Sequence, residues 1–171
     1  MEAPWMDNPR HIVVTGAMGV GKTTIGRKLA VELGLPFLDS DEMLEARTKG
    51  ENAAEIATRD GVERLHELEL ALFLDMCEVA EESVLAPASS VVDHPRGRSS
   101  LSEQLTVWLT APDHVIAVRQ GSAGHRRPMD AATRAELRAK REAHFEAVST
   151  LKVDTGSSTP DEIVDYIIAR L

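Results

Sequence analysis

Short apolar, β-branched runs alternate with longer segments of helical periodicity along the whole chain. The strand patterns cover residues 12–14, 36–38, 83–86, 105–110 and 151–153. Between these runs, apolar residues recur every three or four positions, as they do on one face of a helix. Strands that are separated by helices form parallel sheets covered on both faces. The pattern therefore predicts an α/β fold of three layers, with a five-stranded parallel sheet and helices on both faces.

Capping signals mark several of the expected helix boundaries. A helix that begins at Lys22 should stop at Gly34 and Pro36. Residues 52–55 (NAAE) have the spacing of a capping box, which predicts a short helix after them. Residues 159–162 (TPDE) combine an N-cap threonine, a proline at the first helical position and a capping-box acid. We therefore expect the last helix to start there.

A longer helix is expected after Gly61, and we interpret its apolar stripe as core packing. The stripe consists of Leu65, Leu68, Leu72, Met76 and Val79. Further helices are expected over residues 111–118 and 131–148.

The composition fits a single domain over residues 1–171, with 43% hydrophobic residues. No apolar run approaches the ~20 residues of a membrane span, and the first residues lack the apolar core of a secretory signal. Cys77 is the only cysteine, which suits a reducing cytoplasm, and its apolar neighbours favour a buried thiol.

A net charge of −9 argues against a nucleic-acid backbone as partner. Local basic clusters at residues 126–127 and 138–141 suit a small anionic ligand better. We expect a monomer without a nucleic-acid or membrane partner. Five histidines lack metal-ligand spacing and are expected to be surface or capping residues: His11, His94, His114, His125 and His144.

A glycine-rich turn separates the first strand from the first helix. Residues 16–23 (GAMGVGKT) fit the phosphate-binding pattern G-x-x-x-x-G-K-[ST] at every fixed position. Glycines let successive backbone N–H groups point at phosphate oxygens, and the helix that follows adds its positive N-terminus. Lys22 can reach the β and γ phosphates, and the Thr23 hydroxyl can bind Mg²⁺. The turn therefore predicts a site for a nucleoside triphosphate.

An acidic pair, Asp39 and Asp41, follows the second strand. In α/β folds this carboxyl end of a strand is the edge where ligands bind. One carboxylate can face Mg²⁺ and the other a substrate hydroxyl. The alternative interpretation is helix capping by Ser40 or Asp41.

With these residues in place, the chain resembles the shikimate kinases, which have a nucleoside-monophosphate-kinase-like P-loop fold. The resemblance is carried by GAMGVGKTTIGRKLAVELGLPFLDSDEMLE and continues, in order, through ENAAEIATRDGVERLHELE, RRPM, AKREAHFEAV and LKVDTGSSTPDEIV. It implies a kinase that moves the γ-phosphoryl group of ATP, with Mg²⁺, to a hydroxyl of a small, carboxylate-bearing acceptor. It also implies a lid at about residues 120–130.

The resemblance assigns a role to each matching position. Lys22, Asp41 and Arg127 would be catalytic, with Asp41 binding the acceptor hydroxyl and Arg127 closing from the lid over the phosphates. Asp39 and Thr23 would lie at the metal, and Arg141 would grip the acceptor's carboxylate. The nucleotide contacts would come from Gly16, Gly19, Val20, Gly21, Lys22, Thr23, Thr24 and Pro160, the last beside the adenine.

Departures from the family pattern fall mainly on the acceptor side. His66 stands where the family has an arginine, and an imidazole cannot replace a bidentate guanidinium. Residues 88–90 (Ala-Ser-Ser) replace three glycines, so that Ser89 adds a side chain at the acceptor site. Gln120 lies near the sequence position at which the family often has an adenine-stacking arginine. The pattern indicates intact ATP binding with altered acceptor recognition.

Two alternatives remain beside a kinase of this family. One is a non-catalytic ATP-binding protein descended from such a kinase, although Asp41, Arg127 and Arg141 argue against it. The other is a kinase for a different hydroxylated acceptor, such as gluconate or a nucleoside-type molecule.

Overall fold

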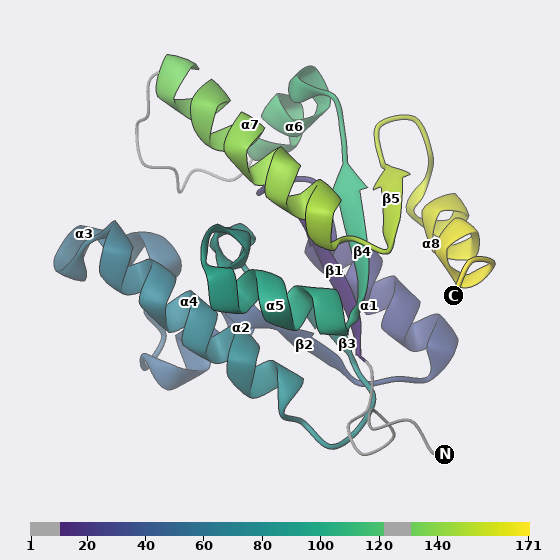
Figure 1. The fold of residues 1–171 in the computed structure, drawn as a ribbon, viewed down its shortest axis with the longest axis horizontal. Coiled ribbons are helices and arrows are strands. Elements are labelled where there is room, and N and C mark those ends of the chain that lie inside the picture. The colour runs from purple at the N-terminus through teal and green to yellow at the C-terminus, as the bar shows by residue number, and fades with distance from the viewer. Residues whose placement is uncertain (1–10, 122–130) are drawn as a thin grey trace.

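A computed structural model describes residues 11–121 and 131–171 of the chain. Its sheet has five parallel strands in the order β2-β3-β1-β4-β5. The strands are β1 (Ile12–Gly16), β2 (Phe37–Asp39), β3 (Val84–Ala86), β4 (Leu105–Thr110) and β5 (Leu151–Asp154). The five-stranded parallel sheet predicted from the sequence is thereby confirmed (Figure 1).

Helices connect the strands and cover both faces of the sheet (Figure 1). They are α1 (Lys22–Leu33), α2 (Ser40–Arg47), α3 (Ala53–Asp60), α4 (Val62–Cys77), the 3₁₀ helix η1 (Ser89–Asp93), α5 (Pro95–Glu103), α6 (Asp113–Gly121), α7 (Ala131–Val148) and α8 (Pro160–Ile168). None of the described helices is long and apolar enough to cross a membrane.

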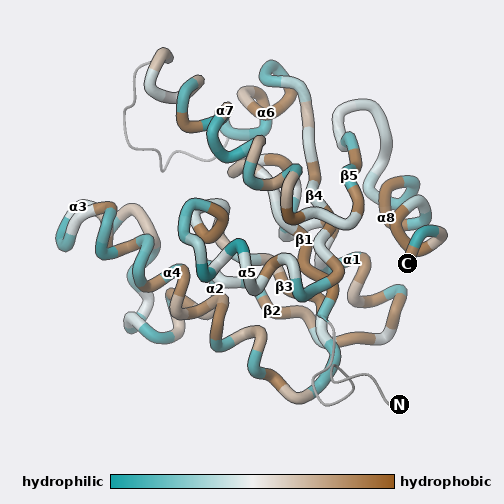
Figure 2. The backbone as a smooth tube through the Cα atoms, in the orientation of Figure 1, coloured by the Kyte–Doolittle hydropathy of each residue, from teal (hydrophilic) through white to brown (hydrophobic). Residues whose placement is uncertain are grey.

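Alternate residues of β1 supply the two hydrophobic cores, one on each face of the sheet. Ile12 and Val14 pack in the cluster that includes α1 and α8. Val13 packs on the other side, with Phe73 of α4 and Phe145 of α7. Figure 2 shows hydrophobic segments concentrated along the strands in the middle of the molecule. The two-residue period of the strand thus decides which helices cover which face.

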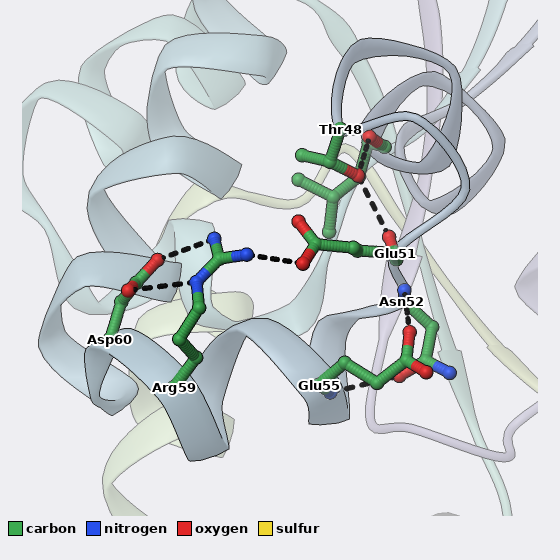
Figure 3. A network of polar contacts seen from close by, with 7 residues as sticks. Thr48, Glu51, Asn52, Glu55, Arg59 and Asp60 are labelled. Atoms are coloured by element: carbon green, nitrogen blue, oxygen red, sulfur yellow. Dashed lines mark hydrogen bonds and ion pairs between the residues drawn. The ribbon is translucent and has the colours of Figure 1, made fainter.

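A third, smaller core joins α2, α3 and α4 away from the sheet. Ile56 is fully buried there, and the capping box predicted at residues 52–55 is present at the start of α3. Arg59 lies between Asp60 and Glu51 in the same network (Figure 3). The Arg59 and Asp60 side chains are 55% and 35% exposed, so this network contributes little to stability.

Several boundary predictions are confirmed, whereas the expected extent of the α4 stripe is wrong. The helix from Lys22 ends at Leu33, before Gly34 at φ 66°, and the second capping box begins α8. The core stripe of α4 stops before Val79, which follows the helix and is 36% exposed.

His11 is not the surface or capping residue that the sequence suggested. It is fully buried, and the Ser83 N–H donates to its Nδ1 atom at 3.2 Å. The opposite ring nitrogen lies 3.2 Å from the carbonyl oxygen of Cys77. Because both ring nitrogens have partners, a polar side chain is tolerated in this part of the interior. Cys77 itself is buried, as predicted.

Candidate active site

The carboxyl ends of three neighbouring strands meet at one edge of the sheet. β3 lies between β2 and β1, and all three are parallel. β1 therefore delivers the glycine-rich turn, β2 delivers Asp39 and Asp41, and β3 leads into η1 at the same edge. This arrangement brings together most of the site residues proposed from the sequence.

The glycine-rich turn contains backbone conformations that residues other than glycine rarely adopt. Gly16 has φ 143°, and a Cβ atom there would lie 2.4 Å from the carbonyl oxygen of Leu109. Gly21 has φ 107° and is the N-cap of α1, whose first turn carries no acidic residue. Val20 is 1% exposed and anchors the turn in the core. The turn therefore offers backbone N–H groups and a helix N-terminus to an anion.

Lys22 curls back over this turn. Its Nζ atom donates to the carbonyl oxygen of Gly16 at 2.9 Å and lies 3.3 Å from that of Ala17. Burial lowers the pKa of Lys22 to about 8, and the nearby Asp41 and Asp39 carboxylates counteract part of this effect. An incoming phosphate would stabilise the charged form of this amine.

Asp39 connects the turn to α2. The Thr23 hydroxyl donates to Asp39 Oδ2 at 2.7 Å, and the backbone N–H of Asp41 donates to Asp39 Oδ1 at 2.8 Å. Asp39 is therefore the N-cap of α2, and not Ser40 or Asp41 as the capping alternative supposed. One buried carboxylate thus caps a helix and faces the hydroxyl of the phosphate-binding turn.

Asp41 lies in the first turn of α2 and is exposed as a whole residue. Partial desolvation of its carboxyl group is the main cause that raises the pKa of Asp41, and the neighbouring Asp39 charge raises it further. The Lys22 charge lowers this pKa. A carboxylate with a raised pKa is a better proton acceptor than an ordinary aspartate.

Glu69 is a site residue that the sequence did not single out. It is 8% exposed on α4 and accepts a hydrogen bond from the Ser90 hydroxyl of η1. Burial raises the pKa of Glu69, the Ser90 hydrogen bond lowers it, and Asp41 raises it further. The available signal was an acid at the Leu65 and Leu72 face of α4, where a charged residue is unexpected.

Arg141 of α7 is paired with an aspartate that the sequence did not reveal. Its Nε atom lies 3.1 Å from both carboxylate oxygens of Asp93, and its Nη2 atom donates to Asp93 Oδ2 at 2.7 Å. Its Nη1 atom lies 3.3 Å from the Ser89 hydroxyl. Half-buried His66 is close enough that burial and then the Arg141 charge lower the pKa of its imidazole. Arg141, Ser89 and His66 are thus gathered on this side of the site.

The nucleotide side has further contacts that the sequence did not predict. Arg119, near the end of α6, donates to the carbonyl oxygen of Val20 at 2.9 Å and to Thr155. Gln120 donates to the carbonyl oxygen of Met18 in the turn. These contacts fix the base of the expected lid, whereas Arg127 lies outside the described residues. Thr24 in α1 and Pro160 at the start of α8 are exposed.

Comparison with known proteins agrees with this geometry. The family model described as shikimate kinase matches residues 18–171. The chain is 31% identical to the shikimate kinase of Zymomonas mobilis subsp. mobilis, over 100% of this chain and 98% of that relative. It is 34% identical to the shikimate kinase of Mycobacterium ulcerans, over 93% of this chain and 88% of that relative.

Solved structures show the same fold. A shikimate kinase from Acinetobacter baumannii in complex with shikimate has a TM-score of 0.86 at 24% identity, over 96% of this chain and 93% of that one. A gluconokinase from Sinorhizobium meliloti 1021 has a TM-score of 0.58 at 24% identity, over 94% of this chain and 90% of that one. The chain therefore belongs to the shikimate kinase family of small-molecule kinases.

Proposed function

We propose that this chain transfers the γ-phosphoryl group of ATP to a hydroxyl group of a shikimate-like acceptor. One observation carries the proposal: the turn with Lys22, the Thr23–Asp39 pair and the Asp41 carboxylate lie at one edge of the sheet. Parallel sheets of this kind bind ligands at that edge. The family of the chain supports both the reaction and the class of acceptor.

The turn would bind and orient the phosphates. The N–H groups of residues 16–24 and the N-terminus of α1 supply an anion site, and Lys22 adds a positive charge once phosphate replaces the Gly16 and Ala17 carbonyls as its partner. Pro160 would lie against the adenine and Arg127 would close from the lid, which we place at about residues 120–130 of a single domain.

Thr23 and Asp39 fit the requirements of Mg²⁺. Both offer oxygen atoms, 2.7 Å apart, next to the phosphate turn. No group of three or more His, Cys, Asp or Glu side chains that could hold a metal ion occurs among residues 11–121 and 131–171. A site with only the Thr23 and Asp39 oxygens from the protein suits Mg²⁺, because this ion keeps several waters and takes substrate phosphate oxygens as ligands. When bound, the ion would neutralise charge on the β and γ phosphates.

Asp41 would hold the acceptor hydroxyl and receive its proton. The acceptor oxygen forms a bond to the γ-phosphorus, the bond from that phosphorus to the bridging oxygen breaks, and ADP leaves. His66, Ser89 and Arg141 would border the acceptor. Catalysis would rest on positioning and charge neutralisation. We further infer a monomer that works in the cytoplasm on a small-molecule acceptor.

The direct test is ADP release from Mg-ATP with shikimate, quinate, gluconate or no acceptor, and with Lys22→Met as the blank. We expect release that depends on shikimate and is lost in the blank. ATP binding without release on any acceptor would instead indicate a non-catalytic nucleotide-binding protein. Release that depends only on gluconate would identify a different acceptor class.

A further inference from the structure

The Arg141–Asp93 ion pair differs from the other ion pairs of the described residues in its burial. Its side chains are 16% and 23% exposed, whereas every side chain in the other pairs is at least 35% exposed. The pair also has bidentate geometry, because the Nε and Nη2 atoms of Arg141 both contact the Asp93 carboxylate. Such a pair is stronger and more directional than an exposed one.

The backbone around Asp93 is fixed by α5. Arg98 donates to the carbonyl oxygens of Val92 and Asp93 at 2.9 and 3.0 Å. Gly97 packs so closely on η1 that a Cβ atom there would lie 2.0 Å from the Val91 carbonyl oxygen. Asp93 is therefore held toward Arg141 by the packing of two helices.

The pair lies at the acceptor side of the site. η1 follows β3, which runs between the strands that deliver the phosphate turn and Asp41. Within η1, Ser89 contacts Arg141 and Ser90 contacts Glu69. The charge of Arg141 also reaches Lys22 and Glu69, since it lowers the pKa of each.

The surrounding charges make Arg141 important for any anionic acceptor. Asp41 and Glu69 contribute carboxyl groups to this part of the site, and the amine of Lys22 is taken up by the phosphate turn. The lowered pKa of His66 favours an uncharged imidazole. An acceptor carboxylate would therefore have to displace Asp93 from Arg141 or share one positive charge with it.

We propose, on the basis of the proposed function, that Asp93 is a specificity-determining residue: it competes with the carboxylate of an anionic acceptor for Arg141. An uncharged acceptor of the same shape binds without this exchange. The apparent association constant of an anionic acceptor equals its intrinsic value multiplied by the fraction of protein in which Arg141 is available. Hydrogen bonds to charged groups of this kind correspond to a change of about 10- to 100-fold in an equilibrium constant.

The test compares shikimate with its uncharged methyl ester in binding calorimetry, both in the presence of Mg-ADP. The variant Asp93→Asn keeps the shape of the side chain and removes its charge. Asp75→Asn is the matched control, because Asp75 also pairs with an arginine, Arg47, but at an exposed position on α4. Asp93→Ser is a second variant in case the asparagine form does not fold, and thermal melting checks each protein.

We expect Asp93→Asn to bind shikimate about 10- to 100-fold more tightly than the parent protein, with the methyl ester changed less than about 3-fold. If the parent binds shikimate too weakly to measure, the appearance of binding in the variant is the expected result. A folded variant with unchanged, weaker or still undetectable shikimate binding would overturn the proposal. So would an equal gain for both ligands.

The failure of the proposed function is separable from the failure of this inference. Turnover with ATP tests the first, and calorimetry with Mg-ADP tests the second. If no acceptor supports ADP release in either protein, the kinase proposal fails, while the shikimate and methyl ester affinities still decide the role of Asp93.

Discussion

Lys22→Met should make the nucleotide-free protein more stable at neutral pH, although it removes the lysine of the phosphate turn. Burial lowers the pKa of Lys22 from 10.5 to about 8. The unfolded chain therefore binds more protons than the native one between these values, and stability rises with pH through that window. Below pH 8 the burial of charged Lys22 destabilises the folded protein to its full extent, and the pKa difference corresponds to roughly 3 kcal/mol.

The hydrogen bonds of Lys22 reduce the expected gain. Its contacts with the Gly16 and Ala17 carbonyls contribute about 1 kcal/mol each at most. A net gain of about 1–2 kcal/mol remains for the methionine variant at pH 7, which raises Tm by about 2–8 °C in a chain of this size. The difference should shrink above pH 8 and disappear, or reverse, near pH 10.5.

Urea denaturation followed by circular dichroism at pH 7, 9 and 10.5, without nucleotide, measures this effect. Lys28→Met is the matched control, because Lys28 lies on the same helix but is exposed and paired with Asp161. Its replacement should not reproduce the pH-dependent gain. A Lys22→Met variant that is less stable than the parent at pH 7, or that differs from it equally at all three pH values, would refute the argument. Mg-ATP should reverse the order by stabilising only the parent.

Three further predictions concern packing, metal binding and thiol reactivity. Gly97→Ala should cost about 2–3 kcal/mol in urea denaturation, because the added Cβ meets the Val91 carbonyl oxygen at 2.0 Å; a loss below 0.5 kcal/mol would contradict this packing. Asp39→Asn keeps an N-cap for α2, so stability should change by less than about 1 kcal/mol, while the Mg²⁺ concentration for half-maximal ADP release rises at least about 10-fold; an unchanged Mg²⁺ requirement would argue against Asp39 near the ion. Burial raises the pKa of Cys77 to about 12, so a thiol reagent at pH 8 should label it at least about 100-fold more slowly in the native protein than in urea, and equal rates would show that it is accessible.

The fold and the phosphate turn could be predicted because their signals are local. The β-branched run 12–14, the glycines of residues 16–21 and the helical spacing after Lys22 lie within one continuous stretch. Most of these residues act through their own backbone conformation or their nearest neighbours in the sequence, although Gly16 also packs closely against Leu109. The same holds for the capping boxes at residues 52–55 and 159–162, where side chain and backbone lie three positions apart.

The stretch between β3 and β4 was not predicted, although part of its signal was present. η1 and α5 occupy residues for which no helix was expected. His94 is the N-cap of α5 and accepts from the Arg96 N–H, and Pro95 takes the first helical position. This is the same proline signal that correctly marked α8. Histidine is a rare cap, and glycine and serine residues follow, so the helical pattern was weak.

The acceptor side could not be predicted in full because its geometry depends on residues far apart in the sequence. Arg141 and Asp93 are separated by 48 positions, and Ser90 and Glu69 by 21. The sequence drew attention to Arg141, Ser89 and His66, which lie near one another in the structure, but it gave no reason to look at Asp93. An arginine is a carboxylate receptor only to the extent that no carboxylate of the protein already binds it. The partner of Arg141, which only the fold reveals, therefore decides how this site treats an anionic acceptor more than the presence of the arginine does.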